Sequence, residues 1–165
     1  MVDAVVREVR PEDGAEISAL HARAFGPGRY ARTAYRIREG KGLSSRYCRV
    51  CLIEGRIIAA VRFTPITIGG KAGALLLGPL AVDPAFANRG YGRGLVGNAM
   101  DAARGDGLSL VLLVGDEPYY ARLGFVRVPL GQIVFPGPVN PMRILAAELA
   151  PGSLPKFQGM VAAHM

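Results

Sequence analysis

Apolar residues gather in short runs that predict strands, and the longest run lies near the middle of the chain. Residues 74–82 are almost wholly apolar, as expected for a central strand covered on both faces. Asp83-Pro84 ends this run, because proline lacks an amide donor and fixes φ. A second apolar run at 108–114 predicts another buried strand. Since a predicted helix at 92–104 separates the two runs, they should be parallel neighbours joined by a right-handed crossover.

The rest of the pattern predicts a mixed α/β domain around this unit. Glu54-Gly55 is a hairpin turn, so antiparallel strands lead into the central one. The helical spacing of Ile17, Leu20 and Ala24 predicts an early helix, and His21 is expected on its face rather than as a base. Further strands are expected at 5–9, 46–53, 56–68, 125–130 and 144–149, and helices from 10–13 to 26–28, at 29–38 and at 118–123.

Glycines follow the central strand at close spacing. The segment Asn88-Arg89-Gly90-Tyr91-Gly92-Arg93-Gly94 lets the backbone curl close to a ligand as the helix begins. The free N–H groups of a first helical turn and the positive end of the helix dipole form a site for phosphate. Inside the helix, Leu95, Ala99 and Met100 should face the core. The segment therefore predicts a site for a diphosphate.

A dinucleotide-binding fingerprint competes with this interpretation. Residues 92–97 match G-x-G-x-x-G literally. In a dinucleotide-binding unit the first glycine follows its strand almost at once, whereas here residues 83–91 intervene. Antiparallel strands also come first, and too little chain follows for a second βαβ half. The context therefore argues against a nicotinamide cofactor.

Composition narrows the class of protein. The chain has 165 residues and is half apolar, which predicts one domain covering residues 1–165. Its net charge of +7 suits an acidic ligand, but the charges are scattered without interleaved aromatic residues, which argues against nucleic acid. We expect a cytoplasmic protein with no membrane partner, because the N-terminus does not resemble a signal peptide and no apolar run reaches membrane length.

The two cysteines form a C-x-x-C pair without a metal or redox role. Cys48 and Cys51 lie in a strand-like run, where residues three apart point to opposite faces. There is no second cysteine pair, and His21 and His164 are the only histidines. No metal site is expected, and both thiols are interpreted as structural.

Two motifs resemble the GNAT N-acetyltransferase superfamily. Val82-Asp83-Pro84 with residues 87–92 resembles its acetyl-CoA-binding motif, which is Gln or Arg, two residues, Gly, one residue, then Gly or Ala. Aligned from the Pro84 turn, the Gln/Arg position is Ala87, a departure that removes any side-chain role there. Residues 120–125 match the family's Tyr, three residues, Gly-Phe pattern. The run GD-x-x-YY-x-R-x-GF and the run EL-x-PG resemble the YhbS-like branch of bacterial GNAT proteins.

The resemblance implies a fold and a reaction. The fold would be a mostly antiparallel twisted sheet whose parallel central strands splay around acyl-CoA, with helices on both faces. The reaction would be direct attack of an amine on the thioester of acetyl-CoA, the co-substrate. The N–H of Leu80 would polarise the carbonyl and Val82 would pair with the pantetheine arm. Co-substrate contacts are then expected at Leu80, Ala81, Val82, Asn88, Arg89, Gly90, Tyr91, Gly92 and Arg93.

The same resemblance implies Tyr120 as the catalytic acid. Its alternative role is a packed aromatic, and Tyr119 is the expected core residue of the pair, although the two could exchange roles. No carboxylate lies on the central strand; Asp116 and Glu117 are the nearest, and Asp116 equally suits a helix cap. The acceptor would be a small-molecule or peptide amine, and a homodimer is left open. The competing classes are an acyl-CoA-binding protein without turnover and a basic interaction module.

Overall fold

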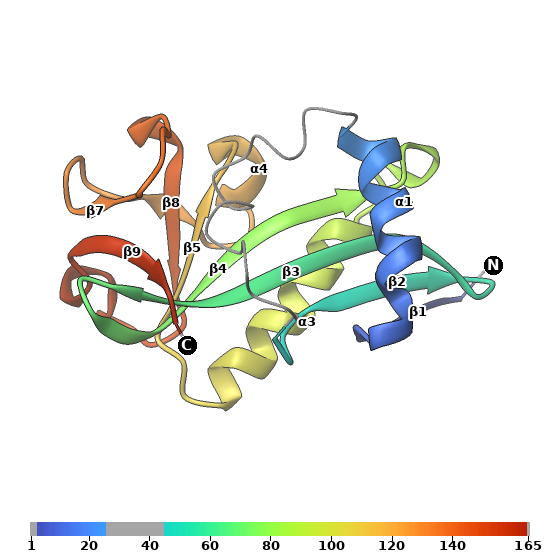
Figure 1. Cartoon of the computed structure of the whole chain (residues 1–165), viewed down its shortest axis with the longest axis horizontal. Coiled ribbons are helices and arrows are strands. Elements are labelled where there is room, and N and C mark those ends of the chain that lie inside the picture. The colour runs from blue at the N-terminus through green and yellow to red at the C-terminus, as the bar shows by residue number, and fades with distance from the viewer. Residues whose placement is uncertain (1–2, 26–44, 165) are drawn as a thin grey trace.

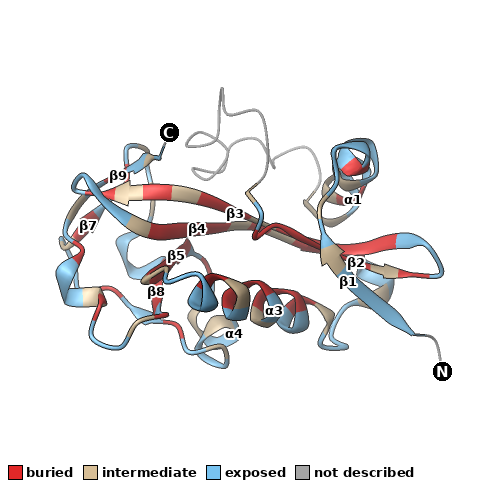
Figure 2. Ribbon diagram, turned by 90° about the horizontal axis from the view of Figure 1, so that it is seen from below, coloured by how far each residue is buried: buried red, intermediate tan, exposed pale blue. Residues whose placement is uncertain are grey.

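The computed structural model describes residues 3–25 and 45–164. Within them a nine-stranded sheet carries helices on both faces, as Figures 1 and 2 show. The strands are β1 (Ala4–Glu8), β2 (Arg49–Ile53), β3 (Arg56–Ile68), β4 (Lys71–Val82), β5 (Leu110–Val114), β6 (Val126–Arg127), β7 (Ile133–Val134), β8 (Ile144–Glu148) and β9 (Gly159–Ala163). The helices are α1 (Gly14–Phe25), α3 (Tyr91–Gly105) and α4 (Glu117–Ala121).

The sheet is mostly antiparallel around one parallel central pair. Its strand order is β1-β2-β3-β4-β5-β8-β6, and β9 pairs with both β3 and β7. Strands β4 and β5 run parallel, with α3 as the crossover between them. This confirms the expected fold class, including the parallel pair and helices on both faces.

The parallel pair separates partway along its length. Its register ends where Leu76 lies opposite Leu112, whereas β4 continues to Val82 and β5 to Val114. On its other side β4 has a bulge, because Phe63 of β3 lies opposite Leu77 but Val61 lies opposite Leu80. The extra residue falls at 78–79 and shifts the alternation of side chains by one. Consequently Leu77 and Leu80 both pack toward α3.

Apolar clusters cover both faces of the sheet. Leu95, Ala99 and Met100 of α3 are buried against the sheet, as their spacing predicts. On the opposite face Leu20 of α1 is fully buried against the β2–β4 region. Figure 2 shows α1 on one side of the sheet and α3 with α4 on the other.

Some expected elements differ in the structure. The strand expected at 125–130 is only the two residues of β6, because Pro129 and Gly131 interrupt the extended run. Strands β7 and β9 were not expected. The helix expected at 29–38 lies outside the described residues. No helix in the described part of the chain is both long and apolar enough to cross a membrane.

The two cysteines are buried thiols in the sheet. Cys51 belongs to the apolar cluster under α3. Cys48 precedes β2, and its Sγ accepts a hydrogen bond from the backbone N–H of Phe63 at 3.3 Å. The predicted structural role agrees with this burial. His21 lies on the face of α1, with its ring 5.6 Å from that of Phe25.

Candidate active site

The start of α3 presents free backbone donors. Gly90 occupies the N-cap position in the left-handed conformation, with φ 86°, and has no side chain to cap the helix. The first intrahelical bond runs from Gly94 N to Gly90 O at 3.0 Å. The N–H groups of Tyr91, Gly92 and Arg93 therefore lack intrahelical acceptors, as in any first turn. Free donors of this kind, together with the positive end of the helix dipole, suit an anion, which is the role that the glycine spacing predicts.

Aromatic and charged side chains fix the loop before this helix. The guanidinium of Arg89 lies over the ring of Phe86 at 5.6 Å, and Tyr91 packs edge-on against the same ring. Asp83 is buried, and its carboxylate accepts from Ala85 N at 2.9 Å and from Arg23 Nε at 3.2 Å. These contacts tie the end of β4 to helix α1. Asn88 is exposed in the left-handed conformation, with φ 62°.

The edge of β4 that faces the splay offers backbone hydrogen-bonding groups. Asp83 N donates to Ile58 O of β3 at 2.8 Å. Amides alternate in direction along a strand, so Ala81 also bonds toward β3, while Leu80 and Val82 direct their N–H and C=O toward the open side. The co-substrate roles expected of Leu80 and Val82 need backbone groups on this side, and those roles stay a prediction. Ala81 is not brought to the site, because its methyl packs under α1 and its amide faces β3.

The two tyrosines of α4 point in different directions. The ring of Tyr120 packs edge-on against Phe125 at 5.7 Å and lies over Gly115, where an added Cβ would be 2.8 Å from its Cε2. Tyr119 is 39% exposed, so the expectation that it is the core residue of the pair is wrong. Adjacent residues on a helix face about 100° apart, and the sheet side belongs to Tyr120.

Tyr119 reaches the start of α3 instead. A Cβ added at Gly92 would lie 2.7 Å from the Tyr119 hydroxyl and 3.3 Å from Cγ2 of Val82. Partial burial raises the pKa of Tyr119, against an opposing effect of the Arg93 charge. Its hydroxyl therefore remains protonated at neutral pH and can donate a hydrogen bond beside the start of α3. The proximity of Tyr119 to Gly92 was not predictable from the sequence, because no motif links the two residues.

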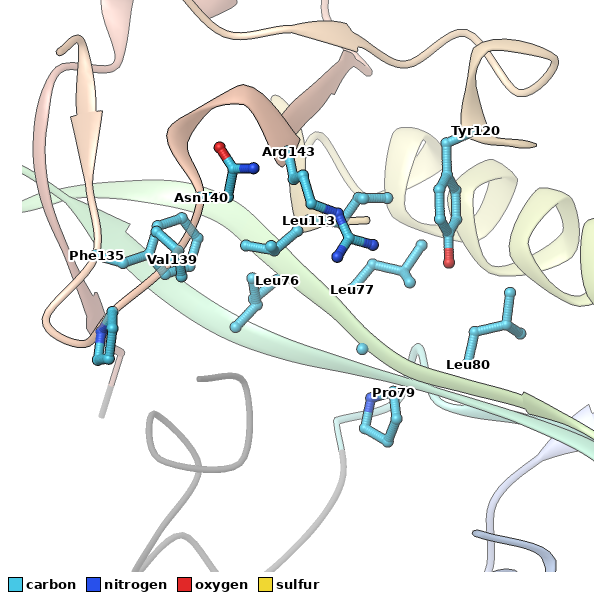
Figure 3. A pocket seen from close by; sticks show the side chains of 13 residues that line it. Leu76, Leu77, Pro79, Leu80, Leu113, Tyr120, Phe135, Val139, Asn140 and Arg143 are labelled. Atoms are coloured by element: carbon cyan, nitrogen blue, oxygen red, sulfur yellow. The ribbon is translucent and has the colours of Figure 1, made fainter. Parts of the chain in front are cut away.

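A cavity of about 380 Å³ lies at the splay. Figure 3 shows its lining side chains. They come from residues 76–80 of β4, Leu113 and Val114 of β5, Tyr120 of α4, and Phe135, Pro138, Val139, Asn140 and Arg143 before β8. Leu76 belongs to the apolar cluster on one face of the sheet, and Leu77 to the cluster on the other. Residues from the clusters on both faces of the sheet therefore line the cavity where the parallel strands separate.

The charges around this cavity come from outside the predicted motifs. Arg143 lines it and forms an ion pair with Asp116 at 2.8 Å. Asp116 occupies the N-cap position of α4 but makes no side-chain cap bond. Glu117 pairs with Arg127 at 3.5 Å. Among the described lining residues there is no carboxylate.

The structure also clarifies the glycine motif. The pattern of Arg, two residues, Gly, one residue, Gly is met in full by Arg89, Gly92 and Gly94, and this match places Gly92 and Gly94 in the first turns of α3. Alignment from the Pro84 turn assigned the arginine position to Ala87, two residues too early. The departure at Ala87 therefore disappears, and an exposed Arg89 begins the motif.

A splayed parallel pair with an open cavity and an uncapped glycine-rich helix start is the architecture of an N-acetyltransferase. Residues 15–125 match the acetyltransferase (GNAT) family, and the protein belongs to that family.

Its relatives agree with this assignment. The chain is 30% identical to the uncharacterized N-acetyltransferase YhbS of Escherichia coli over 122 residues, 73% of this chain and 72% of that one. The crystal structure of E. coli YhbS in complex with CoA has a TM-score of 0.86 at 27% identity, covering 99% of this chain and 91% of that one. A GNAT acetyltransferase from Brucella melitensis in complex with acetyl-CoA has a TM-score of 0.75 at 28% identity, covering 98% and 96%. The predicted resemblance is thereby confirmed.

Proposed function

We propose that the protein is a single-domain enzyme that transfers an acetyl group from acetyl-CoA to a small-molecule or peptide amine, by direct attack within a ternary complex. The observation that carries this proposal is the open edge of β4 beside the uncapped start of α3. A β-strand edge and a helix N-terminus at the splay suit an extended amide-containing arm that ends in a diphosphate. The solved relatives that contain CoA and acetyl-CoA support the same co-substrate.

The backbone supplies most of the binding groups in this proposal. The N–H groups of Tyr91, Gly92 and Arg93 bind the diphosphate, and the side chains of Arg89 and Arg93 add positive charge at the exposed rim. Val82 pairs with the amides of the pantetheine arm. Gly92 supports this fit, since a side chain there would fill the space between α3 and β4.

The chemical step needs polarisation of the thioester carbonyl and two proton transfers, one to the departing sulfur and one from the new amide nitrogen. The N–H of Leu80 donates to the thioester oxygen and stabilises the charge that develops when the amine nitrogen attacks the carbonyl carbon. As the carbon–sulfur bond breaks, the Tyr120 hydroxyl protonates the departing sulfur. The new amide nitrogen loses its proton to water, because the described lining residues include no carboxylate. Tyr120 then recovers its proton from solvent.

Steady-state kinetics of Tyr120→Phe and Tyr119→Phe test the assignment. Tyr120→Phe removes only the hydroxyl and leaves the ring packed on Phe125, so kcat should fall about 10²-fold, with KM for acetyl-CoA little changed. Tyr119→Phe should change KM for acetyl-CoA rather than kcat, because its hydroxyl lies at Gly92. A Tyr120→Phe enzyme with parental kcat would refute the acid role and leave Tyr120 as a packing residue.

A binding protein without turnover is the competing function. Calorimetric titration with acetyl-CoA and a CoA-release assay with a panel of amines separate the two. Saturable binding without amine-dependent CoA release would favour the competing function, whereas failure to bind would contradict both.

A further inference from the structure

Arg143 brings a fixed positive charge to the cavity. Its backbone is held at both ends, because Arg143 N donates to Asn140 O at 2.9 Å and Gly115 N donates to Arg143 O at 3.0 Å. In the side chain, Nη2 donates to Asp116 at 2.8 Å and Nε to Gly115 O at 3.4 Å. Nη1 has no partner within the described ranges. Figure 3 shows the guanidinium between Asn140 and Tyr120, above Leu77.

Asn140 adds a second donor beside this group. Its Oδ1 accepts from the backbone N–H of Met142 at 2.9 Å, which determines the orientation of its amide. The remaining Nδ2 group lies on the side of Arg143, as Figure 3 shows. The wall of the cavity before β8 therefore presents donors from Arg143 and Asn140.

The charge of Arg143 is only partly balanced. Its partner Asp116 is 75% exposed, and such an ion pair is strongly screened by water. The described lining residues contribute no carboxylate to the cavity. A cation with an unused donor among mostly apolar lining residues suits an anionic ligand, because the anion would form a charge-assisted hydrogen bond with it.

We propose that the acetyl acceptor carries a carboxylate, which Arg143 binds with the help of Asn140, making Arg143 a residue that determines acceptor specificity. This rests on the proposed function, since the cavity must admit an amine. The planar guanidinium matches a carboxylate geometrically. One guanidinium that shares its charge with Asp116 balances a single negative charge, which favours a carboxylate over a phosphate dianion.

The rest of this wall determines the body of the acceptor. Phe135, Pro138 and Val139 make it apolar, and Leu76 belongs to the same buried cluster. An amine with an apolar body and one carboxylate matches this lining, as in an apolar amino acid.

Matched acceptors test the inference in CoA-release assays. One series is phenylalanine, phenylalaninamide and phenethylamine, a second is built on leucine, and the phosphonate analogue of each amino acid is added. The parental enzyme should show a kcat/KM about 10- to 100-fold higher for the carboxylate than for the neutral amines. The amino acid amide has the more acidic ammonium group, so at neutral pH a larger fraction of it is the free amine that attacks the thioester. A preference for the carboxylate must therefore come from binding and not from the reactivity of the amine.

Arg143→Gln should abolish this preference, and Arg127→Gln is its matched control. Both arginines are about half exposed and pair with carboxylates of the 116–117 segment, but Arg127 does not line the cavity. Thermal melting checks that both variants fold.

Each outcome decides between the inference and the proposed function. Equal or better rates with neutral amines, or a carboxylate preference that survives in Arg143→Gln, would overturn the inference and leave acetyl transfer intact. Phosphonates acetylated as well as carboxylates would overturn the choice of a carboxylate. If every acceptor failed although acetyl-CoA bound, the proposed function itself would be contradicted.

Discussion

Replacing Gly92 with alanine should weaken CoA binding while the protein remains folded. Gly92 is the buried second residue of α3, and its Cβ would lie 2.7 Å from the hydroxyl oxygen of Tyr119 and 3.3 Å from Cγ2 of Val82. The first contact is too short to persist, but the hydroxyl is the far end of a partly exposed side chain that can rotate into solvent. The second requires Val82 to shift by a few tenths of an ångström.

The new methyl group has two opposing effects on the free energy of unfolding, whereas its effect on CoA binding is only unfavourable. Alanine is about 1 kcal/mol better than glycine within a helix, and overpacking costs about 1–3 kcal/mol. The net destabilisation should therefore be about 1 kcal/mol. In the complex, the new methyl group keeps the diphosphate away from the first-turn amides. Loss of one charge-assisted hydrogen bond, about 1.5–3 kcal/mol, weakens Kd roughly 10- to 100-fold.

Titration calorimetry with acetyl-CoA and thermal unfolding measure the two effects separately. Gly97→Ala is the control, because it lies in the same helix with no atom within 4 Å of its added Cβ. It should raise stability and leave Kd unchanged. Adding Tyr119→Phe to Gly92→Ala removes the 2.7 Å contact and should restore stability but not affinity. A Gly92→Ala protein that binds acetyl-CoA like the parent would refute the assignment of this loop.

Two further predictions concern buried polar groups. Asp13 accepts two hydrogen bonds from Arg7, and these lower the pKa of its carboxyl group. The stability that Asp13 contributes is therefore fully present above the ordinary aspartate pKa, and it is lost as the pH falls through the lowered pKa of the folded protein. Asp13→Asn should therefore cost about 2 kcal/mol in urea unfolding at neutral pH and much less near pH 2; an equal loss at both would contradict this. The buried hydroxyl of Thr64 has no partner in the described chain, so Thr64→Val should raise the melting temperature by a few degrees, unlike Thr67→Val at a less buried site of β3.

The central unit was predictable because its signals are contiguous. An apolar run, a proline stop and closely spaced glycines occupy neighbouring positions, and each has a local physical cause. The structure accordingly contains β4, α3 and β5 near their expected bounds. The register of the glycine motif was misjudged at Ala87, because Gly90, Gly92 and Gly94 form two overlapping Gly-x-Gly pairs and the first of them was aligned.

Strands β7 and β9 were not predictable for the opposite reason. Strand β9 pairs with β3 by placing Ile66 opposite Ala163, a contact between distant parts of the chain. The backbones meet closely at Gly69 and Gly159, where an added Cβ on Gly159 would lie 2.8 Å from the Gly69 Cα. In the sequence each glycine looks like an ordinary turn residue, and only the tertiary fold shows that the two are needed for this close backbone approach.

The same distinction separates the two halves of the candidate site. The proposed CoA half is formed by residues 80–94, one continuous segment whose backbone does most of the binding, so a motif can describe it. The proposed acceptor half combines residues 76–80, the end of β5 and residues 135–143, and its charge depends on Arg143, which no motif includes. Backbone contacts tolerate changes of side chain, whereas a single substitution at Arg143 alters the charge of the cavity. Proteins that share the glycine motif can therefore bind the same co-substrate and still differ in their acceptors, and acceptor class must be argued from the cavity wall.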